Sequence, residues 1–403
     1  KEELRDIAFK LPYWIENDKS DQYFNNKYIL ETGIRLYNSI ELSLDGLHEL
    51  LAKNEDLILE QHQEDSDFIK LTTVGKKAKY LRLAGKIEEA EEILKEYNRL
   101  KQTVKLGKVS WELGERETEM FNEYIELKSK IILDMPSDQI LAFFSINEDI
   151  IVDPIENEEN AKQSVKNSIS NIFNTSVFDI NSNFQELEGS EKIDREKIRR
   201  YSISHGFRCY SLFLKVFIDG VITGKLNYYK IFEFLEAHTW FGIKLKRRLT
   251  DNEIDQDSSW LTMLAPGIHN LFAQFELSVL MNTNKINNFI LAMDSLTIKF
   301  EGALRDFIRL SGGNTSTSKR GEIKEQLLEE LLDNPTTTKY FTAKDIELFK
   351  YTFTQNGKNL RNNVAHSFLQ YSDYNLQAVI LVFFCILRLG KYTFKEKSDN
   401  KNL

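Results

Sequence analysis

The chain has 403 residues, of which 41% are hydrophobic and 29% charged, a composition typical of soluble globular domains. Its formal net charge of −9 argues against a general nucleic-acid coat protein. The length predicts two or three domains, and the scarcity of helix breakers, with 5 Pro and 18 Gly, favours an all-α fold.

Targeting and metal-binding patterns are not found in the sequence. The N-terminal stretch is charged and amphipathic, unlike a signal peptide, and the longest apolar run, 378–387, is too short to span a bilayer. Cys209 and Cys385 stand in apolar surroundings, as core cysteines do in a reducing compartment. No Cys/His cluster has the spacing of metal ligands. We therefore expect a cytoplasmic protein without a metal or another cofactor.

Residues 1–133 carry apolar side chains at steps of three and four, which predicts an N-terminal helical domain. Within it, residues 78–101 have an Ala-x-x-Leu pattern followed by Gly85, like one unit of a tetratricopeptide repeat. Only one clear copy is found, whereas a solenoid needs several copies. A plain helical hairpin is therefore the preferred interpretation.

Residues 134–193 interrupt the helical pattern. They hold two prolines, an acidic stretch and a polar run of poor periodicity, which predict an irregular linker that crosses between domains. Two apolar runs in it, 140–146 and 149–153, are candidates for short strands. Helices resume in a middle region over residues 194–284, where Pro266 is expected at a break near the start of the last helix.

Residues 285–403 predict a C-terminal antiparallel helical bundle. Its first helix spans 285–313 and stops at Gly312 and Gly313. A flexible loop over 314–321, a second helix over 322–334 and a third helix ending at Gly357 are expected next. A short helix and a long buried helix over 373–394 complete the bundle. From Lys285 onward, 17 Lys and Arg stand against 13 Asp and Glu, so only this part of the chain is suited to a polyanion.

The short helix of the bundle reads "NLRNNVAHSF" and begins at Asn359, a residue type that favours an N-cap. Asn362 and His366 are four residues apart and share a helix face. Arg361 lies about 140° around the axis from His366 and borders that face. The opposite face is apolar and is expected to be buried: Leu360, Val364 and Phe368.

These residue types suit the cleavage of a phosphodiester. The arginine offers a planar fork of donors to phosphate oxygens, and the histidine can take or give a proton near neutral pH. The asparagine can orient the imidazole ring or the phosphate. Because the ribose supplies its own nucleophile, the 2′-hydroxyl, a metal-independent ribonuclease needs little beyond such a set.

The spacing from arginine to histidine is not specific by itself, because Arg200 and His205 have the same spacing. The alternative interpretation of the motif is therefore an exposed arginine together with a histidine that caps or lines the bundle. What distinguishes Arg361 and His366 is the fuller string Arg-Asn-x-x-Ala-His before an apolar final helix. His205 lies among apolar residues and is interpreted as a core or boundary residue, and Trp240 and Trp260 are interpreted as packing residues.

The fuller string resembles the HEPN superfamily (higher eukaryote and prokaryote nucleotide-binding domains), helical bundles whose late helix carries Arg-polar-x3-His and longer variants. It is most similar to a bacterial subfamily whose motif reads close to Asn-Leu-Arg-Asn-x-x-Ala-His-Gly, with Ser367 here in place of the glycine. The resemblance covers residues 285–394. It implies metal-independent cleavage of RNA, often in toxin–antitoxin or anti-phage systems, by a homodimer whose two motifs face one cleft.

The resemblance also assigns roles. His366 would act as acid or base, Arg361 would hold the scissile phosphate, and Asn362 would support them. Sites of this family often gain an acidic residue from an early bundle helix, which makes Glu301 and Asp306 supporting candidates.

Glu301 also forms an i,i+4 pair with Arg305, and a solvated ion pair explains these two residues equally well. Many members of the family are not known to cut RNA, so a non-catalytic module that dimerises, binds nucleotide or serves as a scaffold stays open. In either case the N-terminal region would sense a trigger, control assembly or bind a partner protein.

Overall fold

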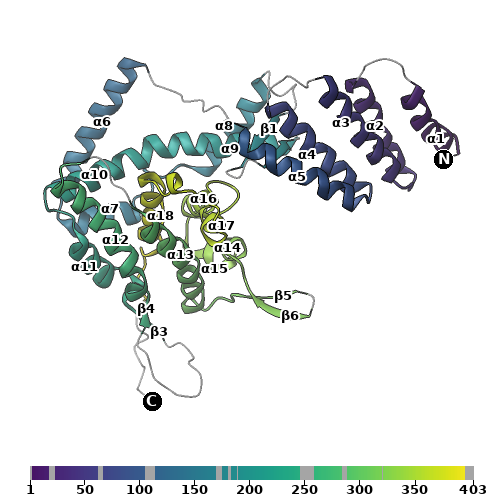
Figure 1. Ribbon diagram of the computed structural model, residues 1–403. Helices are drawn as coiled ribbons and strands as arrows, with labels where there is room; N and C mark the ends of the chain where they lie inside the picture. Colours follow the sequence, from purple (N-terminus) through teal and green to yellow (C-terminus); the bar gives the residue numbers. More distant parts are fainter. Residues whose placement is uncertain are drawn as a thin grey trace. The chain divides into compact units, whose positions relative to one another are not determined.

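The computed structural model describes residues 2–17, 23–61, 67–104, 114–168, 175–179, 183–187, 189–245, 258–283, 288–319 and 321–394. This part of the chain is helical apart from short two-stranded sheets, so the expected all-α class is confirmed (Figure 1). The chain divides into two compact units. Unit 1 holds Lys1–Glu112 and Ser176–Glu186, and unit 2 holds Leu113–Thr175 and Leu187–Leu403.

Unit 1 contains five helices in the described residues, each of which packs on the next along the chain. They are α1 (Glu2–Asn17), α2 (Tyr23–Ser39), α3 (Asp45–Gln61), α4 (Asp67–Leu83) and α5 (Ile87–Thr103). Gly85, with a φ of +76°, makes the turn from α4 to α5, which confirms the helical hairpin expected there. The strand pair β1 (Thr175–Phe178) and β2 (Phe184–Leu187) adds to this unit, where Glu186 forms an ion pair of 2.7 Å with Lys76.

In the residues that the structure describes, the first half of unit 2 consists of helices and one short strand pair. In chain order its first elements are α6 (Glu115–Leu133), α7 (Ser137–Ile146), α8 (Pro154–Asn167), α9 (Ser190–His205), the π-helix η2 (Gly206–Tyr210), α10 (Ser211–Ile222), α11 (Tyr228–His238), the 3-10 helix η3 (Trp240–Gly242), β3 (Lys244–Leu245), β4 (Ser258–Ser259) and α12 (Trp260–Leu280). Pro266 lies inside α12, which is continuous from Trp260 to Leu280 and capped by Ser259, so the break expected at this proline is not found.

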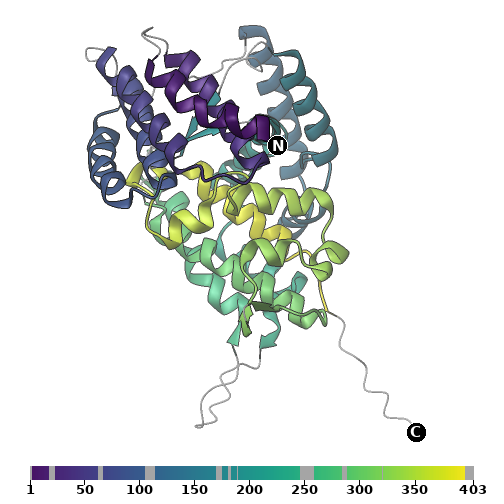
Figure 2. The same ribbon diagram turned by 90° about the vertical axis from the view of Figure 1, so that its right-hand side faces the viewer.

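The remaining elements of unit 2 carry the motif. They are α13 (Ile290–Leu310), β5 (Ser316–Lys319), β6 (Glu322–Glu325), α14 (Leu328–Leu332), α15 (Pro335–Tyr340), α16 (Ala343–Phe353), α17 (Leu360–Ala365), the 3-10 helix η4 (Tyr371–Asp373) and α18 (Leu376–Leu389). The apolar helix α18 is buried along nearly its whole length and packs on α7, α13 and α16. In both Figure 1 and Figure 2, the green and yellow helices from α13 to α18 lie together.

The structure differs from the expected domain division. The run 140–146 lies in α7 rather than in a strand, and Ile140, Leu141 and Phe144 are fully buried. A short apolar run has no periodicity that separates a buried strand from a buried helix. The segment 134–193 thus supplies α7 and α8 to unit 2, and the middle and C-terminal regions share one continuous core instead of forming separate bodies.

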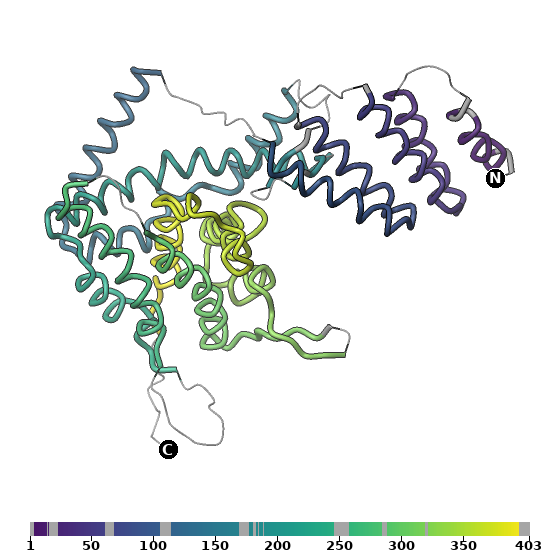
Figure 3. The backbone as a smooth tube through the Cα atoms, in the orientation of Figure 1, coloured from purple at the N-terminus to yellow at the C-terminus, as the bar shows by residue number. Residues whose placement is uncertain are grey.

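The β5–β6 hairpin is a second difference, because a loop over 314–321 and a helix over 322–334 were expected. Ser316 pairs with Glu325 and Lys319 with Glu322, with Gly321 at a φ of +80° in the connection. Figure 3 shows the hairpin projecting away from the helices of unit 2. Helix propensity is a weak prior that tertiary contacts override, and Glu325 is held by Arg309 at 2.8 Å. The helical part of this segment is limited to α14.

A buried charged cluster joins three elements of unit 2. The side chains of Asp345 on α16 and Arg388 on α18 are fully buried, and Arg388 Nε donates to Asp345 Oδ1 at 2.7 Å. Lys391 Nζ donates to the other carboxylate oxygen at 2.6 Å. Arg388 Nη1 donates to the carbonyl of Asn147, just after α7, at 2.9 Å. Buried charges are tolerated only when paired in this way, so the cluster holds α7, α16 and α18 in one arrangement.

His205 makes the stability of unit 2 depend on pH. It is buried beside the rings of Tyr201, Tyr351 and Phe384, and this burial lowers its pKa to about 4. In the unfolded chain the imidazole of His205 binds a proton near pH 6.5, whereas in the folded chain it stays neutral until the pH is much lower. Protonation of His205 therefore does not lower the stability of unit 2 above pH 6.5. We expect the free energy of unfolding to decrease by roughly 2–3 kcal/mol as the pH falls from 7 to 4.

Urea unfolding followed by tryptophan fluorescence at several pH values measures this loss. The variant His205→Leu has no ring to protonate, so its stability should fall less steeply between pH 7 and 4 than that of the wild type. Equal slopes for the two proteins would contradict the assignment. The burial of His205, Trp240 and Trp260 confirms that they are packing residues.

None of the helices in the described residues combines the length and the hydrophobicity that a membrane crossing requires.

Candidate functional site

The motif lies on α17 and the turn that follows it. Asn359 precedes the helix with a φ of +52° and makes no side-chain cap, contrary to the expected N-cap. The helix ends at Ala365, and the N–H of His366 donates to the carbonyl of Asn362 at 3.0 Å. His366 therefore still lies one turn after Asn362, as expected.

The imidazole of His366 is exposed to solvent, and its ring stacks on that of Phe368 with centroids 5.5 Å apart. Within the described part of the chain, no side chain or backbone group forms a hydrogen bond with this imidazole. Phe368 was expected to be buried with Leu360 and Val364, yet 47% of it is exposed. The helix has ended by then, and Ser367 turns the chain with a φ of +57°, so the apolar face does not continue to Phe368.

Arg361 is held in place by its neighbours. Its Nε donates to Glu301 Oε2 at 2.7 Å, and its Nη1 donates to Asn362 Oδ1 at 3.0 Å. Asn362 in turn donates from Nδ2 to Asn359 Oδ1 at 2.9 Å. No described residue forms a hydrogen bond with Nη2 of Arg361, and 26% of the side chain is exposed. The guanidinium of Arg361 is thus held through Nε and Nη1, and its Nη2 can donate to a ligand.

Glu301 joins the motif to α13. Its carboxylate is 11% exposed and binds Arg361 through Oε2 and Arg305 through Oε1, the latter at 2.8 Å. The expected i,i+4 pair of Glu301 and Arg305 is therefore present. Arg305 also lies 3.5 Å from a carboxylate oxygen of Glu325, so Glu301 links Arg361 to a cluster in which the charges are balanced.

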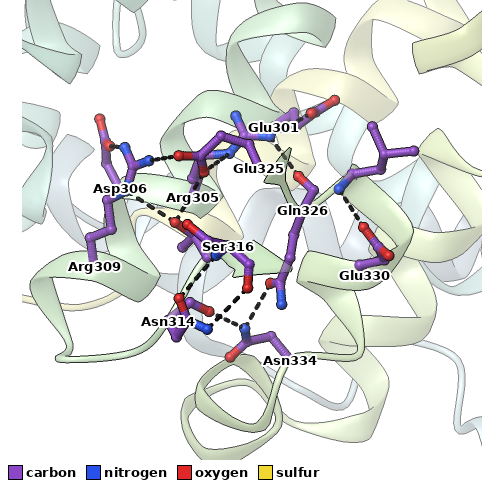
Figure 4. Close-up of polar contacts among 12 residues, drawn as sticks. Glu301, Arg305, Asp306, Arg309, Asn314, Ser316, Glu325, Gln326, Glu330 and Asn334 are labelled. Atoms are coloured by element: carbon purple, nitrogen blue, oxygen red, sulfur yellow. Dashed lines mark hydrogen bonds and ion pairs between the residues drawn. The ribbon is translucent and has the colours of Figure 1, made fainter. Parts of the chain in front are cut away.

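Arg305 and Arg309 extend this network to the base of the β5–β6 hairpin (Figure 4). Arg305 Nη2 also donates to the carbonyl of Gln326 at 2.9 Å, and Arg309 Nη2 donates to Glu325 at 2.8 Å. Asp306 accepts hydrogen bonds from Trp260 Nε1 at 3.0 Å and from Arg309 Nη1 at 3.2 Å. Of the two acidic candidates on α13, Glu301 is therefore the one that binds the motif.

Two residues of unit 2 that contact each other were not predicted from the sequence. Asp294 lies seven residues before Glu301 and so on the same face of α13, and Tyr374 follows His366 by eight residues. Burial raises the pKa of the Asp294 carboxyl, and burial together with a hydrogen bond to Asp294 raises the pKa of Tyr374 to about 12. The seven-residue spacing from Glu301 is the signal that could have pointed to Asp294.

Among the residues that the structure describes, no three His, Cys, Asp or Glu side chains gather as metal ligands would. Comparisons of the chain with protein-family models, with curated proteins and with solved structures find no match.

Proposed function

We propose that this protein is a metal-independent endoribonuclease of the HEPN type, a cytoplasmic effector of stress, toxin or anti-phage defence. Its catalytic residues are Arg361, Asn362 and His366. One observation carries the proposal: an exposed imidazole follows, five residues later in the chain, an arginine that a shielded carboxylate holds in place.

The contacts of Arg361 give each residue a role. Glu301 and Asn362 fix Nε and Nη1, which leaves Nη2 to donate to an oxygen of the scissile phosphate. An arginine that is already oriented loses little conformational freedom when it binds the phosphate. His366, exposed to solvent, exchanges a proton with the 2′-hydroxyl or with the leaving 5′-oxygen. Glu301 and Arg305 act as positioning residues.

A homodimer through the C-terminal bundle completes the proposed site. Cleavage by 2′-hydroxyl attack needs one group to take a proton and another to give one, whereas each chain places one histidine in the motif. Phe368, whose ring stacks on His366, and Tyr371, five residues after it, are 47% and 68% exposed and would supply apolar surface for a second copy. Two facing motifs would then provide both the acid and the base.

The test is RNA cleavage in the presence of EDTA. The wild type should cut a single-stranded RNA and leave the DNA of the same sequence intact, because only ribose carries the nucleophile. The variant Arg361→Ala is expected to lower the rate by roughly 10²–10³-fold, the effect of removing one oxyanion donor. Arg200→Ala is the matched control, since Arg200 has the same spacing to a histidine but lies on α9. Full activity of Arg361→Ala would overturn the site assignment.

The alternative function is a non-catalytic HEPN-like module that dimerises, binds nucleotide or serves as a scaffold. The observation that favours it is that Nε and Nη1 of Arg361 are both engaged within the chain, as in a structural ion pair. RNA or nucleotide binding without cleavage under the same conditions would support this alternative.

A further inference from the structure

Helix α6 has two apolar faces, of which only one is covered. Ile125, Ser129 and Ile132 are buried, where the helix packs on α10. The other face carries a stripe of large apolar side chains that are exposed by 50–61%: Met120, Tyr124, Leu127 and Ile131. In Figure 1, α6 stands at an edge of unit 2. A contiguous exposed apolar stripe of this kind is typical of a protein interface.

The spacing of the stripe identifies the kind of interface. The steps between its residues are four, three and four, which is the heptad pattern of a coiled-coil seam rather than the wider pattern of a core face. Met120 and Leu127 occupy d positions, and Tyr124 and Ile131 occupy a positions. In parallel coiled coils, Ile at a and Leu at d, as at Ile131 and Leu127, favour two strands over three or four. The stripe is about 16 Å long, from the rise per residue of an α-helix.

The charges beside the stripe indicate what covers it. Glu123 occupies the g position directly before Tyr124, and Lys128 occupies the e position directly after Leu127; both are exposed. In a parallel pair, the g residue of one helix faces the e residue of the next heptad of its partner. Two copies of α6 would therefore place Glu123 of each opposite Lys128 of the other. Lys128 Nζ already lies 5.8 Å from the ring of Tyr124, at the border of the stripe.

We propose that two copies of this chain associate through α6 as a short parallel coiled coil. The stripe and its charges are self-complementary, as a twofold interface requires. Two heptads alone are too short for a stable isolated pair, but α10 already holds α6 as a helix, so little conformational entropy is lost on pairing. The inference does not rest on ribonuclease activity, and its test uses no RNA.

The first experiment measures the mass of the full chain in solution over a range of concentrations, by analytical ultracentrifugation. The wild type should associate as its concentration rises, to a dimer if α6 is the single interface and to larger assemblies if the bundle interface proposed above forms as well. Leu127→Glu buries an unpaired charge at the seam and should raise the dissociation constant by ~100-fold or more. The matched control is Leu280→Glu, at an 83% exposed leucine at the end of α12, which should dimerise like the wild type.

Three outcomes would overturn the proposal. They are a wild type that stays monomeric at every concentration, an association of Leu127→Glu that equals that of the wild type in size and affinity, and equal losses in Leu127→Glu and Leu280→Glu. If Phe368→Glu removes the dimer while Leu127→Glu does not, the dimer forms beside His366 and not through α6. A wild-type protein that dimerises but does not cleave RNA would contradict the proposed ribonuclease activity and leave the α6 interface unaffected.

Two further variants test the charge pair and the orientation. Glu123→Lys should weaken the dimer, and the double variant Glu123→Lys with Lys128→Glu should restore it. Leu127→Cys should form a disulfide between copies under mild oxidation, since d residues face each other in a parallel pair. The native cysteines do not interfere, because Cys209 and Cys385 are buried. Failure of both the charge rescue and the cross-link would exclude the parallel arrangement.

Discussion

The variant His366→Ala is expected to cleave RNA roughly 10²–10⁴-fold more slowly than the wild type, the contribution of a general acid or base. The side chain is exposed, and no described residue depends on it for a hydrogen bond, so its loss should leave the fold and the melting temperature unchanged. Initial rates on one labelled RNA in EDTA, together with a thermal melt of each protein, measure both quantities.

The control for this prediction is His269→Ala, at another exposed histidine that packs on an aromatic ring, that of Tyr228. Its cleavage rate should equal that of the wild type. If His366→Ala retains the wild-type rate, His366 is not the acid or base. Activity that survives both Arg361→Ala and His366→Ala would place the cleavage site elsewhere or in a contaminant.

The variant Asp345→Ala is expected to destabilise unit 2 by about 3–5 kcal/mol, because it removes one partner from a buried ion pair. Arg388 would keep its charge in a place without water and without a carboxylate, and Lys391 would lose its partner as well. The change also removes the capping box that Asp345 forms with Thr342 at the start of α16. Urea unfolding monitored by the fluorescence of the buried Trp240 and Trp260 measures the loss.

Asp333→Ala is the matched control. Asp333 forms an ion pair of 2.6 Å with Lys350, but its side chain is 68% exposed. Exposed pairs of this kind contribute up to about 1 kcal/mol, because water screens the charges. Similar losses of stability in Asp345→Ala and Asp333→Ala would show that the buried cluster has no special structural role.

The helical elements could be predicted from the sequence because helical order is local. The three- and four-residue spacing of Ile290, Met293, Leu296, Phe300 and Leu304 places a helix there whatever surrounds it, and α13 contains all of them. The apolar run near the C-terminus has no such spacing, and its length indicated the buried helix that the structure shows as α18. The pair of Glu301 and Arg305 is local as well, since i and i+4 residues meet on any helix.

The structure differs from the sequence predictions where a local pattern does not reveal which residues pack against one another. Residues 140–146 form a helix that the sequence did not reveal, because a short and mostly apolar run has no periodicity that separates a helix from a strand. Residues 322–325 became a strand, although their composition favours a helix, because the facing strand and the arginines of α13 offered contacts to Glu325. Phe368 became exposed because the chain turns at Ser367.

The sequence by itself determined the all-α class, most helices of the bundle and the place of the motif on a short helix, all through spacings of a few residues. Only the tertiary structure decided which acidic residue meets the motif. Glu301 and Arg361 are 60 positions apart, and α13 packs on α17, so Glu301 bonds Arg361 while Asp306 bonds Trp260 and Arg309. A contact across such a distance depends on how helices pack, which no local spacing encodes.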